Sequence, residues 1–206
     1  MQQPTLTLIA GCNGAGKSTY SKLFVEEGIE PFDYDKIYLA KLANLKESEL
    51  NNQIALNQTT EELNTKIKEA FQNRNSFCFE TNLHVFPYSW IEEANLKGYL
   101  IEMYFFCLDS IQTAKERVFI RTRNNGHNVS DEIIEYKWKE GYKNINLNFK
   151  LFDYLSFIDN STNDIPTLLF EILKIDQQHF QFIQLVKQLP NFVERRLPSI
   201  FNQLIK

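Results

Sequence analysis

Short apolar runs alternate along the chain with longer segments in which apolar residues recur at helical spacing. The run Ile101–Leu108 is apolar at almost every position, which is typical of a strand covered on both faces. The expected strands are Leu6–Ala10, Ser76–Glu80, Leu100–Leu108, Tyr154–Asp159 and Leu168–Leu173, with a short one near Glu30–Asp33. The expected helices are 17–27, 47–73, 87–97, 110–124 and 130–149. Alternation of this kind predicts an α/β fold with a mostly parallel sheet flanked by helices.

The alternation weakens after about Thr162. Residues 177–206 are expected to form two short helices separated by Pro190. Neither an internal repeat nor a low-complexity linker is visible, and 206 residues suit one domain of ordinary size. The simplest division is a main domain over 1–162, with a strand and a short helical C-terminal tail over 163–206 packed on that same domain.

One segment carries an explicit chemical motif. Residues 11–19 read Gly-Cys-Asn-Gly-Ala-Gly-Lys-Ser-Thr, which fits the phosphate-loop pattern G-x-x-x-x-G-K-S/T between a strand and a helix. Glycines let backbone N–H groups converge on phosphate oxygens, and the helix dipole adds positive potential. Lys17 is expected to reach the outer phosphates and act in catalysis, and Ser18 to bind Mg²⁺. The predicted nucleotide contacts, in a P-loop NTPase fold, are Gly11, Asn13, Gly14, Ala15, Gly16, Lys17, Ser18 and Thr19.

The rest of the chain narrows the class of phosphate-loop protein. The strings D-x-x-G and N-K-x-D, which serve switching and guanine recognition in GTPases, do not occur. Only seven glycines occur in the chain and three lie in the loop, so the second Gly-rich signature of transporter ATPases is also missing. A small kinase needs less: a magnesium carboxylate, a base on the acceptor side, and arginines for the transferring phosphoryl group.

Carboxylates directly follow two of the predicted strands, where α/β sheets present their ligands. Asp33 and Asp35 follow the short strand. Asp35 is the preferred catalytic base, with helix N-capping as its alternative role, and Asp33 is the second candidate. Glu80 ends a buried strand, where a carboxylate is costly without a partner such as Mg²⁺ or a substrate hydroxyl. A surface glutamate at a strand end is the alternative.

Basic residues gather near the end of the helix at 110–124. Arg117 and Arg121 are four residues apart and share a face, from which they can clamp phosphates opposite the loop. Arg121 is the preferred catalytic arginine, and a solvated basic helix end is the alternative. His127, in the following turn, either touches the acceptor or caps the helix, and Lys137 is a further candidate phosphate contact.

Composition limits the partners and the compartment. A formal charge of −4 argues against nucleic-acid binding through the whole surface. The apolar stretches are too short and too often interrupted by charges to cross a membrane, and no signal peptide is visible. Cys12, Cys78 and Cys107 are odd in number and lack metal-site spacing. We therefore expect a reduced, cytoplasmic protein.

Taken together, these segments resemble the zeta-toxin-like family of phosphate-loop kinases, and most closely its stand-alone branch, often labelled a predicted ATPase. The resemblance covers roughly residues 5–162 and rests on strings that occur in family order. The strings are Ile9–Thr19, Phe32–Ile37, Phe77–Leu83, Glu116–Val118, Gly126–Val129 and Asp159–Ser161. The loop alone is unspecific, whereas its combination with Phe-Glu-Thr and the Gly-His turn is distinctive.

The resemblance implies ATP-dependent phosphorylation of a small acceptor, and UDP-N-acetylglucosamine and related sugar nucleotides are the known acceptors of the true toxins. It implies that Asp35 is the base and that Glu80 and Thr81 hold the acceptor. It further implies that Arg117 and Arg121 face the phosphates.

Two positions depart from the family pattern. Cys12 stands where the branch prefers proline, which leaves a thiol in the loop. The helix after the Gly-His turn reads Glu135-Tyr136-Lys137-Trp138, where the branch is arginine-rich ahead of an aromatic residue. Lys137 can supply a point charge there, but it cannot make the bidentate contact of an arginine.

Two classes of function therefore stand as hypotheses. The leading one is a small-molecule kinase that uses ATP and Mg²⁺ and transfers the γ-phosphoryl group to a hydroxyl, with Asp35 accepting the proton. The alternative is a nucleotide-gated ATPase that binds an antitoxin or another protein without acceptor chemistry. Phosphorylation of nucleic-acid ends is a third reading, which the acidic balance disfavours.

Overall fold

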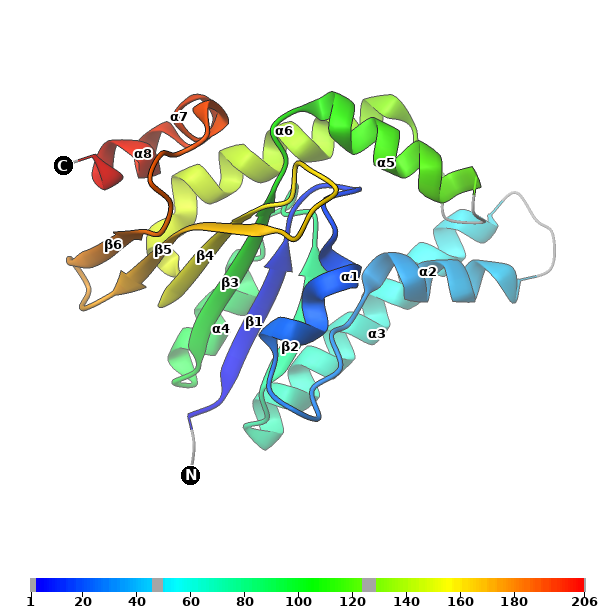
Figure 1. Ribbon diagram of the computed structural model, residues 1–206. Helices are drawn as coiled ribbons and strands as arrows, with labels where there is room; N and C mark the ends of the chain where they lie inside the picture. The colour runs from blue at the N-terminus through cyan, green and yellow to red at the C-terminus, as the bar shows by residue number, and fades with distance from the viewer. Residues whose placement is uncertain (1–2, 46–49, 124–128, 206) are drawn as a thin grey trace.

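The sheet that organises the chain is seen in a computed structural model, which describes residues 3–45, 50–123 and 129–205. Within those ranges it has six strands in the order β2-β1-β3-β4-β5-β6 (Figure 1). They are β1 (Thr5–Ala10), β2 (Phe77–Thr81), β3 (Leu100–Cys107), β4 (Tyr154–Asp159), β5 (Thr167–Lys174) and β6 (Phe180–Gln184). The first four in this order run parallel, and β5 and β6 are added antiparallel. The carboxyl ends of β1, β2 and β3 therefore meet at one edge of the sheet.

Helices connect and flank these strands (Figure 1). They are α1 (Lys17–Tyr20), the 3-10 turn η1 (Ser21–Phe24), α2 (Tyr34–Ala43), α3 (Asn51–Asn73), α4 (Tyr88–Leu96), α5 (Ile111–Arg123), α6 (Asp131–Asn148), the 3-10 turn η2 (Phe149–Leu151), α7 (Asn191–Arg196) and α8 (Pro198–Leu204). Ser130 caps α6, as its position before two acidic residues favours, because its side chain accepts a hydrogen bond from the N–H of Ile133. No described helix combines the length and the apolar character that a membrane crossing requires.

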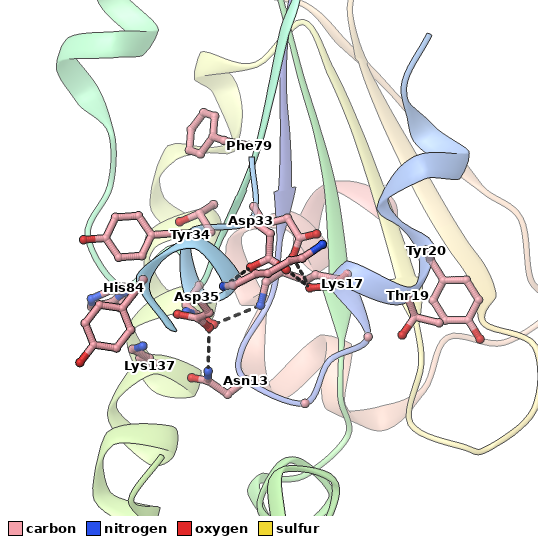
Figure 2. A pocket seen from close by; sticks show the side chains of 18 of the residues that line it. Asn13, Lys17, Thr19, Tyr20, Asp33, Tyr34, Asp35, Phe79, His84 and Lys137 are labelled. Carbon is pink, nitrogen blue, oxygen red and sulfur yellow. Dashed lines mark hydrogen bonds between the residues drawn. The ribbon is translucent and has the colours of Figure 1, made fainter. Parts of the chain in front are cut away.

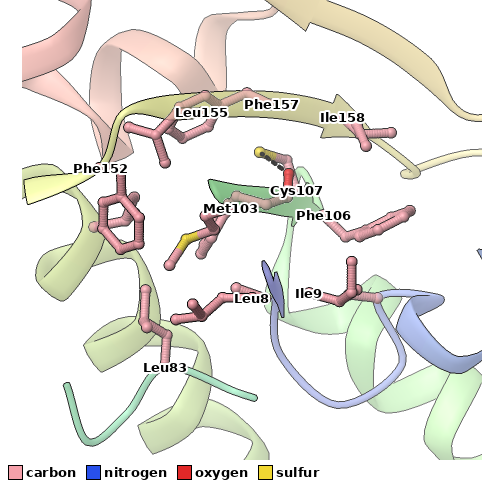
Figure 3. Packing of buried hydrophobic residues seen from close by; sticks show 14 of the residues in the cluster. Leu8, Ile9, Leu83, Met103, Phe106, Cys107, Phe152, Leu155, Phe157 and Ile158 are labelled. Atoms are coloured by element: carbon pink, nitrogen blue, oxygen red, sulfur yellow. Dashed lines mark hydrogen bonds between the residues drawn. The ribbon is translucent and has the colours of Figure 1, made fainter. Parts of the chain in front are cut away.

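Apolar side chains fill both faces of the sheet, which explains why the strands read as continuous apolar runs. Leu8 and Met103, which are paired in register, lie on one face together with Phe152 (Figure 3). Ile9 and Phe106 lie on the other face (Figure 3). All five side chains are almost completely buried. The core fixes the sheet rigidly beneath the phosphate loop, which starts where β1 ends.

Two of the expected elements near the N-terminus were wrong in extent. No strand forms at Glu30–Asp33; only Phe32 makes a parallel bridge, to Phe79 at the free edge of β2. The helix expected at 17–27 is α-helical only over Lys17–Tyr20 and then tightens into η1. The ring of Phe24, the last residue of η1, packs against Tyr104, with ring centroids 4.6 Å apart.

The expectation of two helices over 177–206 was half right. Helices α7 and α8 follow Pro190, but residues 180–184 form the strand β6 instead of a helix. The rings of Phe180 and Phe182 pack on Phe149, and the backbone pairs with the exposed edge of β5. This partner is distant in sequence, so the local pattern could not reveal it. The guanidinium of Arg196 then lies over the ring of Trp138, 4.3 Å from its centroid, and fastens the tail to α6.

Candidate active site

The phosphate loop has the backbone that its glycines predict. Gly11, Gly14 and Gly16 have φ angles of +142°, +80° and +94°, which disfavour any residue with a side chain. A Cβ atom on Gly16 would lie 2.3 Å from the side-chain amide nitrogen of Asn160. That amide donates a 2.9 Å hydrogen bond to the carbonyl of Ala15. The loop is therefore held from the end of β4 as well as by its own sequence.

Lys17 is buried and directs its ammonium group back at the loop. Its Nζ atom donates to the carbonyls of Gly11 and Cys12, at 2.8 and 3.2 Å, and to Oδ1 of Asn82 at 3.1 Å. An ammonium has three donors, so these contacts use all of them. Leu83 adopts a positive φ of 56°, uncommon for a branched residue, at the turn that carries Asn82. Binding of a phosphate by Lys17 thus requires exchange of at least one of the three contacts.

Ser18 lies between two carboxylates. Its Oγ atom is 2.9 Å from Oδ2 of Asp33 and 2.7 Å from Oε2 of Glu80. The bridge between Phe32 and Phe79 brings these carboxylates together, because each follows one of the bridged residues. Burial raises the pKa of Glu80, the hydrogen bond from Ser18 lowers it, and the neighbouring Asp33 raises it again.

This oxygen set fits the magnesium ion that the motif implies. The hydroxyl of Ser18 has one proton for two carboxylate oxygens, so one oxygen has no proton to accept from it. Mg²⁺ prefers hard oxygen ligands and is usually held by one or two carboxylates together with substrate phosphates. A cation at this point would relieve the repulsion between Asp33 and Glu80.

Asp35 faces the loop from the first turn of α2. The helix cap is Asp33, whose Oδ1 accepts from the N–H of Lys36, so capping does not occupy Asp35. Oδ2 of Asp35 is 3.4 Å from the amide nitrogen of Asn13, a long contact between α2 and the loop. Figure 2 shows Asp35 between Asn13 and Asp33, with Lys137 and His84 on the side away from the loop. Asp35 is thus one of the groups that line the cleft.

The two arginines of α5 have different surroundings although they share a helix face. The guanidinium of Arg117 donates to the backbone carbonyls of Asn160 and Thr162, and so ties α5 to the segment after β4. Arg121 is solvent-exposed and lines the same cleft. Arg117 is therefore bonded to backbone carbonyls in this structure, whereas the side chain of Arg121 is exposed in the cleft.

Of the residues expected on the acceptor side, Lys137 and Thr81 both line the cleft. Burial lowers the pKa of Lys137, Asp35 raises it, and Lys17 and Arg121 lower it, so these charges lie near one another. The hydroxyl of Thr81 accepts from the N–H of Leu83 at 3.0 Å and stabilises the turn after β2. His127 lies outside the described residues.

One continuous cleft of about 1220 Å³ joins these groups. One end is formed by the phosphate loop, α5 and the segment after β4, and the other by α2, α3 and the residues between β2 and α4. Thr19, at the start of α1, is exposed at the loop end. A cleft of this size has room for a nucleotide together with a second small molecule.

No protein-family model and no curated protein matches the chain. Solved structures do. One from the PezAT chromosomal toxin–antitoxin system of Streptococcus pneumoniae is 15% identical, with a TM-score of 0.61 over 100% of this chain and 89% of that one. The AvrRxo1-ORF1:-ORF2 structure with ATP is 10% identical, with a TM-score of 0.62 over 98% and 76%. A putative kinase from Chloroflexus aurantiacus is 17% identical, with a TM-score of 0.52 over 68% and 78%.

The chain has the fold of these structures, an α/β fold with a mostly parallel sheet flanked by helices. The predicted fold class is thereby confirmed, and so is the likeness to zeta-toxin-like kinases at the level of the fold. Asn82, His84 and Asn160 are among the residues that line the cleft although no role was predicted for them from sequence. Asn160 and Asn82 do lie within strings of the family resemblance, which was the only signal available.

Proposed function

We propose that this protein is an ATP-dependent small-molecule kinase that transfers the γ-phosphoryl group to a hydroxyl of its acceptor. The observation that carries the proposal is the position of Asp35. Its carboxylate lies in the same cleft as Lys17 and Ser18 and contacts the loop through Asn13. A carboxylate that neither caps its helix nor leaves the cleft is suited to accept a proton from a hydroxyl beside the γ-phosphate.

The proposed reaction is an in-line displacement. The acceptor oxygen attacks the γ-phosphorus, its proton passes to Asp35, and the bond from the γ-phosphorus to the β–γ bridging oxygen breaks to release ADP. Lys17, Lys137 and Arg121 neutralise the charge on the transferring group. Ser18, Glu80 and Asp33 are the residues that would hold Mg²⁺, which supplies charge neutralisation at the β- and γ-phosphates when bound.

The chemical class of the acceptor and the existence of a protein partner are also proposals. The family resemblance places sugar nucleotides first among the acceptors to be assayed. Two of the similar structures come from a toxin–antitoxin system and from a complex of two open reading frames. They support a protein partner, such as an antitoxin, as a second element of the proposed function. A gated ATPase without acceptor chemistry remains the alternative, and ATP-dependent association without phosphoryl transfer would identify it.

The test compares the wild-type chain with Asp35→Asn. Labelled ATP and Mg²⁺ are incubated with a panel of hydroxyl acceptors, and labelled product and ADP are quantified. Loss of the general base is expected to lower kcat by about 10²–10⁴-fold, while the Kd for ATP changes little. Glu92→Gln, an exposed carboxylate on α4 outside the cleft lining, is the matched control. If Asp35→Asn retains the wild-type rate, or no acceptor increases ADP formation, the kinase proposal fails.

A further inference from the structure

The end of the cleft beyond Asp35 differs in chemistry from the loop end. We call it the acceptor half, and it is lined by side chains from α2, α3, β2 and the start of α4. Its characteristic members are aromatic or aliphatic: Tyr34, Tyr38, Leu56, Phe79, Val85 and Trp90. Val85 is 68% exposed and Leu56 is 43% exposed, so apolar surface is available to a bound molecule.

Hydrogen bonds to α3 hold the tyrosine hydroxyls of this half. The hydroxyl of Tyr34 is 3.2 Å from the carbonyl of Leu56 and 2.7 Å from the hydroxyl of Thr60. The hydroxyl of Tyr38 donates to Asn52 at 2.9 Å. Phe79 and Trp90, which line the same half, meet edge to face, with centroids 5.4 Å apart. The acceptor half therefore offers ring surface, and flat or apolar groups pack on such surface most favourably.

Positive charge is concentrated around Asp35. Burial lowers the pKa of Lys137, Asp35 raises it, and Lys17 and Arg121 both lower it, so these three cations lie around the carboxylate at the transfer point. Among the described residues that line the acceptor half, the remaining lysine is Lys36, which is solvent-exposed. Asp35 adds negative charge beside it. A diphosphate in this half would lose hydration and gain only one exposed cation, which is worth little.

The helix α6 adds a further aromatic contact beside this part of the cleft. The ring of Tyr136 packs edge to face on His84, with centroids 6.1 Å apart. Burial lowers the pKa of His84, Lys137 lowers it further and Asp35 raises it, so burial and Lys137 favour the neutral imidazole over a cation. Tyr136 and His84 thus add aromatic ring surface near Lys137.

We propose that the acceptor is an uncharged hydroxyl compound with a flat aromatic or apolar body, and that this body binds against Tyr34, Leu56, Val85 and Trp90 in the acceptor half. The inference rests on the proposed kinase function and narrows it: the hydroxyl lies at Asp35 and the body fills the acceptor half. It separates this chain from an enzyme whose acceptor carries a diphosphate.

The test uses three matched probes that share one sugar. They are N-acetylglucosamine, its phenyl β-glycoside and UDP-N-acetylglucosamine, and each is titrated calorimetrically into the wild-type chain with saturating ADP and Mg²⁺. The phenyl glycoside is expected to bind at least 10-fold more tightly than either other probe, which corresponds to about 1.4 kcal/mol. Trp90→Ala is expected to remove most of that difference, whereas Leu96→Ala, an exposed residue on the same helix, is expected to leave it unchanged.

A variant that introduces a positive charge into the acceptor half sharpens the result. Val85→Lys is expected to weaken the phenyl glycoside and to strengthen UDP-N-acetylglucosamine. Tighter binding of the sugar nucleotide by the wild type, or no binding of any probe, overturns the inference. ADP release from ATP with each probe is measured in parallel and reports on the kinase proposal by itself. If the sugar nucleotide alone is phosphorylated, the kinase proposal stands and the inference of an uncharged acceptor fails. If the phenyl glycoside binds tightly but is not phosphorylated, the kinase proposal fails and the inferred preference of the acceptor half stands.

Discussion

Arg117 and Arg121 lie four residues apart on α5. Truncation of Arg117 is expected to lower stability, whereas truncation of Arg121 is expected to lower the catalytic rate. Arg117→Ala removes two charge-assisted hydrogen bonds, to the carbonyls of Asn160 and Thr162. Such bonds contribute about 1.5–3 kcal/mol each, and partial exposure reduces this. We expect a loss of about 1.5–3 kcal/mol in the free energy of unfolding, because Asn160 and the loop that it holds lose their brace.

For a chain of this size each kcal/mol shifts Tm by about 2–4 °C, so Arg117→Ala should melt roughly 3–12 °C below the wild type. Arg121 is exposed, and its truncation should change the free energy of unfolding by no more than about 0.5 kcal/mol. Arg121 is the arginine proposed to neutralise the transferring group, so its truncation should instead lower kcat by about 10²-fold or more.

Differential scanning calorimetry of the two variants without nucleotide, paired with steady-state ADP formation, separates the two roles. Arg117→Lys serves as a further variant, because a lysine cannot span both carbonyls and should recover only part of the stability. The reasoning is refuted if Arg117→Ala melts with the wild type, or if Arg121→Ala carries the larger loss of Tm.

Three further changes test the loop end of the cleft. The pKa of Glu80 in the folded state is raised, so the free energy of unfolding should fall as pH rises through that pKa. Glu80→Gln should reduce this pH dependence in Mg²⁺-free chemical denaturation and should also weaken Mg²⁺ binding. An unchanged pH dependence in the variant would contradict the burial of Glu80 as its cause. Asn160→Ala leaves the carbonyl of Ala15 without its 2.9 Å partner and should cost about 1–3 kcal/mol in urea unfolding, with weaker ATP binding by calorimetry. Asn82→Asp should bind ATP more weakly than Asn82→Ala, because a carboxylate at position 82 holds the Lys17 ammonium more strongly than an amide does and so competes with the phosphate. Equal Kd values for ATP in the two variants would contradict such competition for Lys17.

Local sequence determined the parts of this protein whose contacts are close along the chain. The phosphate loop could be placed to the residue, because glycines at three fixed positions and the strand and helix around them suffice to build it. The buried strands could be recognised because coverage on both faces demands an unbroken apolar run. The cap of α6 at Ser130 is equally local.

Tertiary structure decided everything that depends on which strand lies beside which. The bridge from Phe32 to Phe79 places Asp33 and Glu80 around Ser18, and no pattern in the sequence gives that register. Residues 180–184 pair with β5 because an edge strand offers unpaired backbone groups, although their own pattern was taken for a helix. Helical spacing in the sequence placed Arg117 and Arg121 on one shared face, and both were expected to face the phosphates. Only the path of the chain after β4 commits Arg117 to backbone carbonyls and leaves Arg121 exposed in the cleft.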